Sequence, residues 1–272
     1  MASERSQGLT PVMFLCTGLL VIFFFGFLVY PLLYVFVRAF SFPGATSWLE
    51  RLVLPLHHVF RNPVITESLL NSLLLAVAVT ILTTLVSLPL AHIFAKYRFR
   101  FRQPLFWYLM ALMMVPPSVL MIPNYLILSR LGLLNNLWGL VITVVIDPFA
   151  VFVMRQFIIA LPDDQIESAR IDGATEWRIY RSIVLPQIKP ALATLGLLTF
   201  MFNWNAYLWP LIVLTENDKR TIPVILTWYS TQHSAELNLV MAASVLMVVP
   251  VLIFFVFTQR WIVTGLTLSG GK

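Results

Sequence analysis

Long apolar runs separated by short polar stretches dominate the chain. A helix needs about 20 apolar residues to cross the hydrocarbon core of a bilayer. Six runs predict such helices, over 12–37, 66–91, 105–128, 137–154, 188–214 and 237–258. The first run is too long for the apolar part of a secretory signal and lacks a following small-x-small cleavage site, so we interpret it as a span. The sequence therefore predicts an all-α membrane protein of about six transmembrane helices.

Composition supports this class and argues against others. Of 272 residues, 59% are hydrophobic and 11% are charged, whereas soluble domains carry about 25% charged residues. A net charge of +6 would suggest nucleic acid as the partner of a soluble protein. In a membrane protein it follows from Lys and Arg in cytoplasmic loops, so we expect no nucleic-acid partner. The single Cys16 and the absence of a Cys/His cluster predict neither an internal disulfide nor a metal site.

The basic residues are divided unevenly between the two ends of the predicted spans. Twelve of the 18 Lys and Arg residues fall on the side that carries both termini, and the stretch KYRFRFR at 96–102 holds four of them without an acid. We therefore expect both termini to be cytoplasmic, and we interpret that stretch as a turn in contact with lipid headgroups. We divide the chain into 1–65 (first span and an irregular outer loop), 66–260 (core, including the inner loop 155–187) and 261–272 (cytoplasmic tail).

The inner loop 155–187 is too long for a simple connection, and structureless loops of this length are uncommon. Its first part predicts a short helix, because Asp163 and Asp164 follow Pro162. A carboxylate at a helix start caps free N–H groups and opposes the positive end of the dipole. Glu167 follows Asp164 at the spacing of a capping box. Gly173 predicts the C-terminal turn, because Gly adopts the left-handed conformation without strain.

A second short helix is predicted to begin at Thr175 and to stop running in line at Pro186. Its apolar face consists of Trp177, Tyr180 and Val184. The opposite face of the pair carries Arg170, Arg178 and Arg181. An apolar helix face can fit a groove on another protein, and an amphipathic pair can equally lie on a membrane surface.

The same loop resembles the EAA loop of the permease subunits of bacterial ABC importers. The family pattern is EAA, three residues, Gly, nine residues and then I-x-L-P, and the spacing from Glu167 to Pro186 matches it throughout. Ser168 stands where a second Ala is usual, which is a small change in volume. The resemblance implies a helix and turn that dock on an ATPase, formed by Glu167, Ser168, Ala169, Asp172, Gly173 and Ala174.

Further stretches resemble the carbohydrate branch of that family, which contains the maltose-type permeases. They are Asn71-Ser72, RQF at 155–157, FNWNAYLWPLIVL at 202–214 and the terminal QRWIVTGLTLSGGK. The resemblance implies a permease subunit in the bacterial cytoplasmic membrane, with a second and different permease chain, two cytoplasmic ABC ATPases and an extracytoplasmic solute-binding protein as partners. It implies no cofactor in this chain, because ATP and Mg bind to the partner ATPase.

Polar residues inside predicted spans are candidates for the solute path, because such groups usually face a bundle interior or a cavity. Asn203, Trp204 and Asn205 combine amides with an aromatic face, which suits a sugar, although helix–helix hydrogen bonding is an equal use for them. Asp147 can contact a hydroxylated solute, pair with a partner subunit or mark a broken helix. Asn124 is a weaker candidate, and His92 is expected at the membrane interface.

Two other classes of function stay open on the residues alone. An ion-gradient-driven secondary carrier usually shows inverted repeats and several buried ionisable groups, whereas this sequence has one deep acid and no repeat that we find. An intramembrane enzyme or a scaffold would leave the EAA-like loop unexplained. The terminal SGGK lacks the Gly and the spacing of a phosphate-binding loop. We therefore expect no catalytic activity in this chain, and a neutral, hydroxylated solute.

Overall fold

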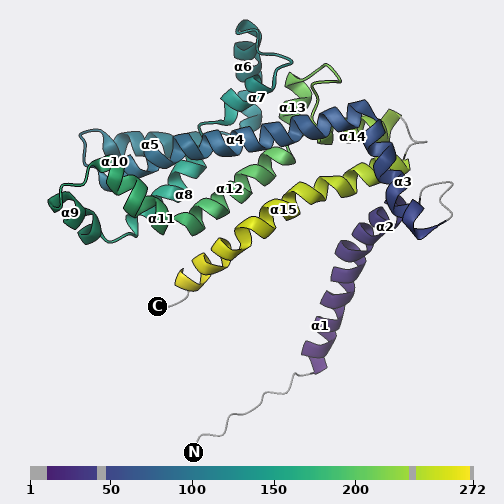
Figure 1. Ribbon diagram of the computed structural model, residues 1–272, viewed down its shortest axis with the longest axis horizontal. Helices are drawn as coiled ribbons and strands as arrows, with labels where there is room; N and C mark the ends of the chain where they lie inside the picture. The colour runs from purple at the N-terminus through teal and green to yellow at the C-terminus, as the bar shows by residue number, and fades with distance from the viewer. Residues whose placement is uncertain (1–10, 42–46, 233–236, 270–272) are drawn as a thin grey trace, which may run out of the picture. The chain divides into compact units, whose positions relative to one another are not determined.

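A computed structural model describes residues 11–41, 47–232 and 237–269, and this part of the chain is helical with no strand (Figure 1). The first ten residues of the chain and the end of the SGGK tail lie outside the described residues. The elements are α1 (Pro11–Phe24), η1 (Phe25–Val29), α2 (Tyr30–Ala39), α3 (Trp48–Arg61), α4 (Pro63–Lys96), α5 (Arg102–Met113), α6 (Pro117–Arg130), α7 (Leu137–Val144), α8 (Pro148–Ile159), α9 (Asp163–Ile171), α10 (Glu176–Ile179), η2 (Tyr180–Val184), α11 (Leu185–Gln187), α12 (Lys189–Trp204), α13 (Leu208–Val213), α14 (Ile222–Gln232) and α15 (Leu237–Ser269).

The structure confirms an all-helical protein with up to six candidate membrane spans. Three are single helices, Met13–Ala39, Pro63–Lys96 and Leu237–Trp261. Three more arise when a bent pair of helices counts as one span, namely α5 with α6, α7 with α8, and the α10–α11 segment with α12. Which side of the membrane holds the termini stays a prediction.

Three of the predicted continuous spans are wrong in detail, and proline stands at two of the breaks. The run 188–214 is divided into α12, which ends at Trp204, and α13, which begins at Leu208. The run 105–128 is divided into α5 and α6, which meet at 98°. The Pro116-Pro117 pair stands at that corner, and a residue before proline is pushed out of the helical conformation. The run 137–154 is divided into α7 and α8, bent by 47°, where Pro148 opens α8.

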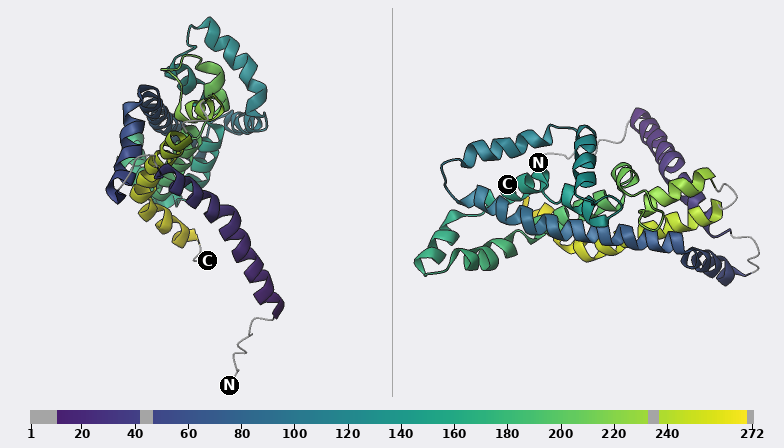
Figure 2. Two further views of the ribbon diagram at one scale, coloured as in Figure 1. Left: turned by 90° about the vertical axis from the view of Figure 1, so that its right-hand side faces the viewer. Right: turned by 90° about the horizontal axis from the view of Figure 1, so that it is seen from above.

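The chain forms two compact units, and the larger contains 63–228 and 247–272. Within it, α4 packs chiefly against α8 and α12. Small residues on the buried side of α4, such as Ala76, Ser87 and Ala91, let the helices approach closely. In the right-hand view of Figure 2, α5 and the green segment α9–α11 lie on opposite sides of the blue α4. The long helix therefore carries a different element on each side.

The smaller unit contains 1–62 and 229–246. Its outer segment was expected to be irregular with short amphipathic pieces, and within it α3 is a 14-residue helix. The sequence signal for it is a capping box: the Ser47 hydroxyl accepts from the Glu50 N–H, and the Glu50 side chain accepts from the Ser47 N–H. Such reciprocal bonds satisfy two free donors at a helix start.

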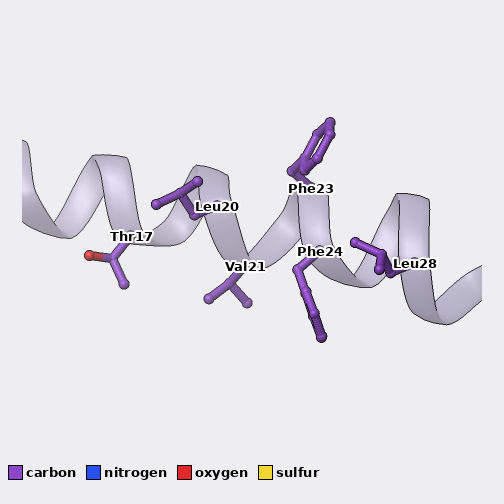
Figure 3. Close-up of a pocket in the computed structure, with 6 residues that line it drawn as sticks. All are labelled: Thr17, Leu20, Val21, Phe23, Phe24 and Leu28. Atoms are coloured by element: carbon purple, nitrogen blue, oxygen red, sulfur yellow. The ribbon is translucent and has the colours of Figure 1, made fainter. Parts of the chain in front are cut away.

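The first span presents apolar side chains to its surroundings along its whole length. Phe14, Leu20 and Phe27 are all more than half exposed. A shallow hollow on its surface is lined by Thr17, Leu20, Val21, Phe23, Phe24 and Leu28, which all belong to one continuous helical segment (Figure 3). Its surface is almost wholly apolar, so it has the character of a lipid-facing helix rather than of a solute site.

Candidate functional site

The inner loop folds as two short helical segments joined by a tight turn (Figure 1). Gly173 has φ +76°, which confirms the left-handed turn predicted for it. The Gly173 N–H donates to the Arg170 carbonyl (3.0 Å) and the Ala174 N–H donates to the Ala169 carbonyl (2.9 Å). These bonds satisfy the last carbonyls of α9, so the EAA-like segment ends at the Gly.

The predicted carboxylate cap at the start of α9 is wrong. Pro162 occupies the N-cap without a side-chain bond. The Asp163 carboxylate instead accepts from Lys96 Nζ at 2.6 Å, and Lys96 also donates to the Leu161 carbonyl at 2.7 Å. This bond and the positive charge of Lys96 hold the pKa of Asp163 below its usual range. The acid therefore ties α9 to the end of α4. The Asp164–Glu167 capping box is not formed.

The start of the second segment agrees with the prediction, since the Thr175 hydroxyl accepts from the Arg178 N–H. The next residue, Glu176, makes the bonds that shape the loop. Its carboxylate accepts from the Tyr97 hydroxyl at 2.6 Å and from Arg170 Nε at 2.8 Å. Glu176 thus connects the residue after α4 with α9. Arg170 is exposed, as expected for the polar outer face, and its guanidinium reaches Glu176 across the loop.

The bonds to Glu176 change the acidity of their donors in the expected directions. The carboxylate raises the pKa of Arg170, because it stabilises the charged guanidinium. Burial, together with the bond to Glu176, raises the pKa of Tyr97 to about 12. Tyr97 and Arg170 therefore keep their protons at any physiological pH, and neither residue loses its hydrogen bond to Glu176 by deprotonation.

Pro186 does not stop the second segment, contrary to expectation. The chain forms a π-helical turn, η2, in which the Leu185 N–H reaches back to the Tyr180 carbonyl. Pro186 then stands in the first turn of α11, where a missing N–H costs little. The direction changes at Ile188 instead, by 77° between the segment ending at Gln187 and α12.

The loop has one buried face and one exposed tip. Ile166, Ile179 and Val184 are buried in an apolar cluster with Ala91 of α4 and Met154 of α8. At the tip, by contrast, Ile171 is 86% exposed and Trp177 is 66% exposed. Trp177 was expected within the apolar face, and only part of that face is covered in this chain.

The motif residues follow this division. Glu167, Ser168 and Asp172 are exposed. Ala169 and Ala174 are half-buried and pack against the apolar cluster. The Ser168 hydroxyl donates to the Asp164 carbonyl of its own helix at 2.7 Å, so it needs no other partner. This bond explains why a Ser fits where the family pattern has an Ala.

His92 lies at the base of the loop and is buried, and the position at the membrane interface expected for it stays a prediction. Its ring is packed against the rings of Tyr97 and Tyr180, with centroids 5.5 Å and 5.2 Å away. Its side chain thereby fills the space between α4 and η2, and it contributes shape rather than a bond.

The candidate path residues occupy helix ends and one core position. Asp147 caps α8, with its carboxylate accepting from the Phe149 N–H at 2.9 Å. It therefore marks a broken helix, which was one of the three alternatives for this residue. Asn203 and Asn205 each donate to the carbonyl four residues earlier in α12. Asn124 is half-buried within α6. Whether any of these four contacts a solute stays a prediction.

Trp204 is placed differently from its neighbours, since it is 1% exposed. Its indole N–H donates to the Met247 carbonyl of α15 at 3.0 Å, and its ring stacks on Phe200. This is the helix–helix hydrogen bond that the sequence offered as an alternative for the trio. In this conformation the ring has no free face for a sugar.

Sequence reasoning missed the residues that hold the loop in place, namely Lys96, Tyr97 and Glu176. Lys96 was placed in a stretch taken to be solvated, but in the structure its side chain is only 6% exposed. No local pattern links Tyr97 to Glu176, which is 79 positions away. Such a pair becomes visible only when α4 and the loop are packed together.

Comparison with known proteins places this geometry in a family. A profile described as "Binding-protein-dependent transport system inner membrane component" matches residues 87–267. The chain is 35% identical to the arabinooligosaccharides transport system permease protein AraQ of Halalkalibacterium halodurans, over 74% of this chain and 72% of that protein. It is 36% identical to the sn-glycerol-3-phosphate transport system permease protein UgpE of Yersinia pestis, over 73% and 71%.

Solved structures of similar fold include a bacterial ABC transporter for the import of the acidic polysaccharide alginate. That chain has a TM-score of 0.77 and 23% identity, and the match covers 96% of this chain and 98% of the other. An alginate transporter in complex with a pentasaccharide-bound periplasmic protein has a TM-score of 0.67 and 17% identity, over 92% and 93%. At these identities the likeness concerns the fold.

Proposed function

Because the chain belongs to the family of binding-protein-dependent transport system inner membrane components, we propose that it is a permease subunit of an ATP-driven importer for a sugar or a related polyol. It forms half of a translocation path in the bacterial inner membrane. Its relatives are permease subunits by name, so ATP binding and hydrolysis, with Mg, fall to a partner ATPase.

The observation that carries the coupling role is the exposed apolar tip on a firmly held loop. Ile171 and Trp177 are exposed, although a large aromatic or aliphatic side chain gains free energy by leaving water, about 1.5–3 kcal/mol when fully buried. Lys96 and Glu176 tie the same loop to α4. A protein that binds the tip can therefore transmit a movement to α4 through these bonds, and we assign that partner as a cytoplasmic ABC ATPase.

The remaining partners follow from the family description. A second permease chain, different from this one, completes the path, and two ATPase subunits bind one loop from each permease. An extracytoplasmic solute-binding protein delivers the solute, as the words "binding-protein-dependent" indicate. The bent helix pairs are consistent with a path, because broken helices in transporters commonly surround the binding site.

The solute is proposed to be neutral and hydroxylated. The accessible path candidates are Asp147, Asn124, Asn203 and Asn205, and no cation stands among them to attract a phosphate ester. Replacing Asp147 by Asn tests this, because Asn also caps a helix and the start of α8 is preserved. We expect KM for uptake to rise by about tenfold through loss of a charge-assisted hydrogen bond. Unchanged kinetics would remove Asp147 from the path.

Affinity purification from native membranes in mild detergent, followed by mass spectrometry, tests the assembly. We expect a P-loop ATPase and a second permease to remain bound. Trp177→Ala should weaken ATPase retention by about thirtyfold, because truncating a central interface Trp commonly costs about 2 kcal/mol. Trp48→Ala is the matched control: Trp48 is 74% exposed and lies on α3, so its loss should leave retention unchanged.

Two results would count against the proposal. A chain that purifies alone, and moves solute into vesicles under an ion gradient without ATP, would make it a secondary carrier. Equal ATPase retention in the Trp177 and Trp48 variants would remove the loop tip from the interface while leaving an importer possible.

A further inference from the structure

Two arginines meet near the end of α4. Arg102 belongs to the stretch 96–102, which was interpreted as a turn in contact with lipid headgroups, and Arg155 belongs to α8. Arg102 Nε donates to the Phe94 carbonyl at 2.9 Å, and Arg155 Nε donates to the same oxygen at 3.1 Å. Arg102 also donates to the Ala95 carbonyl at 3.0 Å. Because both side chains bond one oxygen, their guanidinium groups are neighbours although they come from α5 and α8.

Among the residues that the structure describes, no Asp or Glu forms an ion pair with Arg102 or Arg155. The ion pairs in that part of the chain are Lys96–Asp163, Arg170–Glu176 and Lys219–Asp218. The carbonyl dipoles at the end of α4 offset some of the repulsion. A guanidinium has five N–H donors. Arg98 and Arg100 lie in the same stretch, 96–102, as Arg102. Most of these donors are thus left for an external acceptor.

Packing holds the pair in a defined geometry. Arg155 lies over the face of Phe106, with its Cζ 4.0 Å from the ring centroid. Phe106 itself is 5% exposed and packs against Phe94. Both arginines are half-buried, so their side chains are positioned in advance, and less conformational entropy is lost when an anion binds.

The surroundings of the pair are those of a membrane surface. Arg102 opens α5, which with α6 passes as one bent span. Beside it, the side chains of Phe101, Trp107 and Tyr108 are each more than half exposed. Trp and Tyr are enriched where the hydrocarbon meets the headgroups. In Figure 2, α5 lies on the side of α4 away from α9–α11, whereas Arg155 belongs to α8.

We propose that Arg102 and Arg155 form a binding site for the phosphodiester of an anionic phospholipid. Guanidinium groups bind phosphate oxygens through paired N–H donors. The acyl chains of the lipid would lie along the exposed apolar face of α5. The site uses none of the candidate path residues and neither of the exposed tip residues Ile171 and Trp177, and it would stand even if the transported solute were not a sugar.

The test is native mass spectrometry of the purified full chain in detergent, titrated with phosphatidylglycerol, with phosphatidylcholine and with inorganic phosphate. We expect the chain to prefer phosphatidylglycerol over phosphatidylcholine and to bind inorganic phosphate far more weakly, because the acyl chains contribute to binding. Arg102→Gln and Arg155→Gln should each weaken phosphatidylglycerol binding by about fivefold, the usual effect of one basic residue at an anionic surface.

Arg181→Gln is the matched control. It removes the same charge from an exposed position outside the pair and outside the stretch 96–102, so a loss below twofold is expected. Equal losses in all three variants would mean diffuse attraction and would overturn the site. So would wild-type protein that shows no preference between the two lipids, a result that requires no variant to fold.

Two further outcomes are decisive. If the Gln variants lose the partner ATPase and keep phosphatidylglycerol, the pair binds a protein carboxylate and the lipid proposal is wrong. If inorganic phosphate binds as tightly as phosphatidylglycerol, the site takes a soluble anion instead. The double Arg102→Lys, Arg155→Lys variant keeps the charge, and should retain part of the lipid preference while it loses the paired donor geometry.

Discussion

The two ends of α4 each hold a loop, and they do so with different chemistry. At one end the side chains of Lys96 and Tyr97 bind the charged groups Asp163 and Glu176. At the other end, the Asn71 amide donates to the carbonyls of Asp218 (2.8 Å) and Arg220 (3.2 Å), and the Ser72 hydroxyl accepts from the Ile222 N–H (2.8 Å). One anchor consists of ion pairs between side chains, and the other of neutral bonds to backbone.

The neutral anchor is reinforced by Asn135, which lies in the turn before α7. Asn135 has φ +55°, a conformation that Asn tolerates better than most residues. Its side-chain oxygen accepts from the N–H groups of Thr215 (2.6 Å) and Glu216 (3.1 Å). Backbone bonds of this kind depend little on salt or pH, whereas exposed ion pairs are screened. We therefore expect a rigid outer loop and an inner loop whose hold on α4 can be tuned by conditions.

The largest effect is expected from Gly173→Leu. No atom lies within 4 Å of a Cβ at this position, so the cost comes from backbone strain at positive φ, about 1–3 kcal/mol. The turn after α9 would be displaced, and ATP-driven uptake should fall by at least about tenfold. Uptake by membrane vesicles and the amount of chain in those vesicles measure this.

Gly18→Leu is the control for that variant. Gly18 also has open space around its Cβ but lies within α1 at an ordinary φ, so uptake should be unchanged. Normal uptake by the Gly173 variant, at normal chain levels, would show that the turn has no part in coupling.

The neutral anchor is broken by Asn135→Gly, which keeps the positive φ and removes the side chain. Loss of the bonds to Thr215 and Glu216 should cost about 1–3 kcal/mol, because the N–H groups lose their acceptor. Hydrogen exchange of residues 214–222 should accelerate accordingly, equally in low and high salt. Slow exchange in the variant would show that Asn71 and Ser72 suffice to hold the outer loop.

A smaller effect is expected from Glu176→Gln at the charged anchor. The Arg170 and Glu176 side chains are 40% and 46% exposed, and pairs of this exposure contribute about 0.2–1 kcal/mol. Exchange protection of the α9–α10 segment should fall modestly and should lose its dependence on salt. An unchanged salt dependence would place the sensitivity at Lys96–Asp163 instead.

The smallest effect concerns pH at Asp163, whose pKa is lowered by Lys96. A lowered folded-state pKa means that the contribution to stability is present above the ordinary carboxyl pKa and is lost as pH falls through the lowered value. Protection of α9 should thus be constant near neutral pH and decline only in acid. Asp163→Asn should abolish that acid decline, and a decline that persists would assign it to another carboxylate.

Local signals were sufficient where the responsible residues are close in sequence. The apolar runs, the Gly173 turn and the Thr175 start all depend on neighbours within a few positions. The structure shows the turn and the start, and it shows the runs 12–37, 66–91 and 237–258 as continuous helical segments. The corner at Pro116-Pro117 was also within reach, because two consecutive prolines disfavour a continuous helix. The bounds of α3 were not predicted, although its capping box is readable at Ser47 and Glu50.

Other features could not be read locally, because the partners of a side chain depend on packing. Asp163 and Asp164 both suit a helix cap, yet the nearby Lys96 draws Asp163 away. Trp204 and Asn205 are adjacent in a motif that suits a sugar, but the first is enclosed by Phe200 and α15 while the second is exposed. No residue close to Arg155 in sequence indicates that its side chain lies beside Arg102.

The sequence by itself determined the class of protein, its spans and the EAA-like loop, because hydropathy and turn chemistry act over a few residues. Only the tertiary structure decided which side chains are bonded, buried or left free. Ile171 and Trp177 remain exposed, Glu176 is used on α4, and two arginines meet at one carbonyl. Those outcomes depend on helices far apart in the chain coming into contact, since hydrogen bonds and burial are settled only after the helices pack.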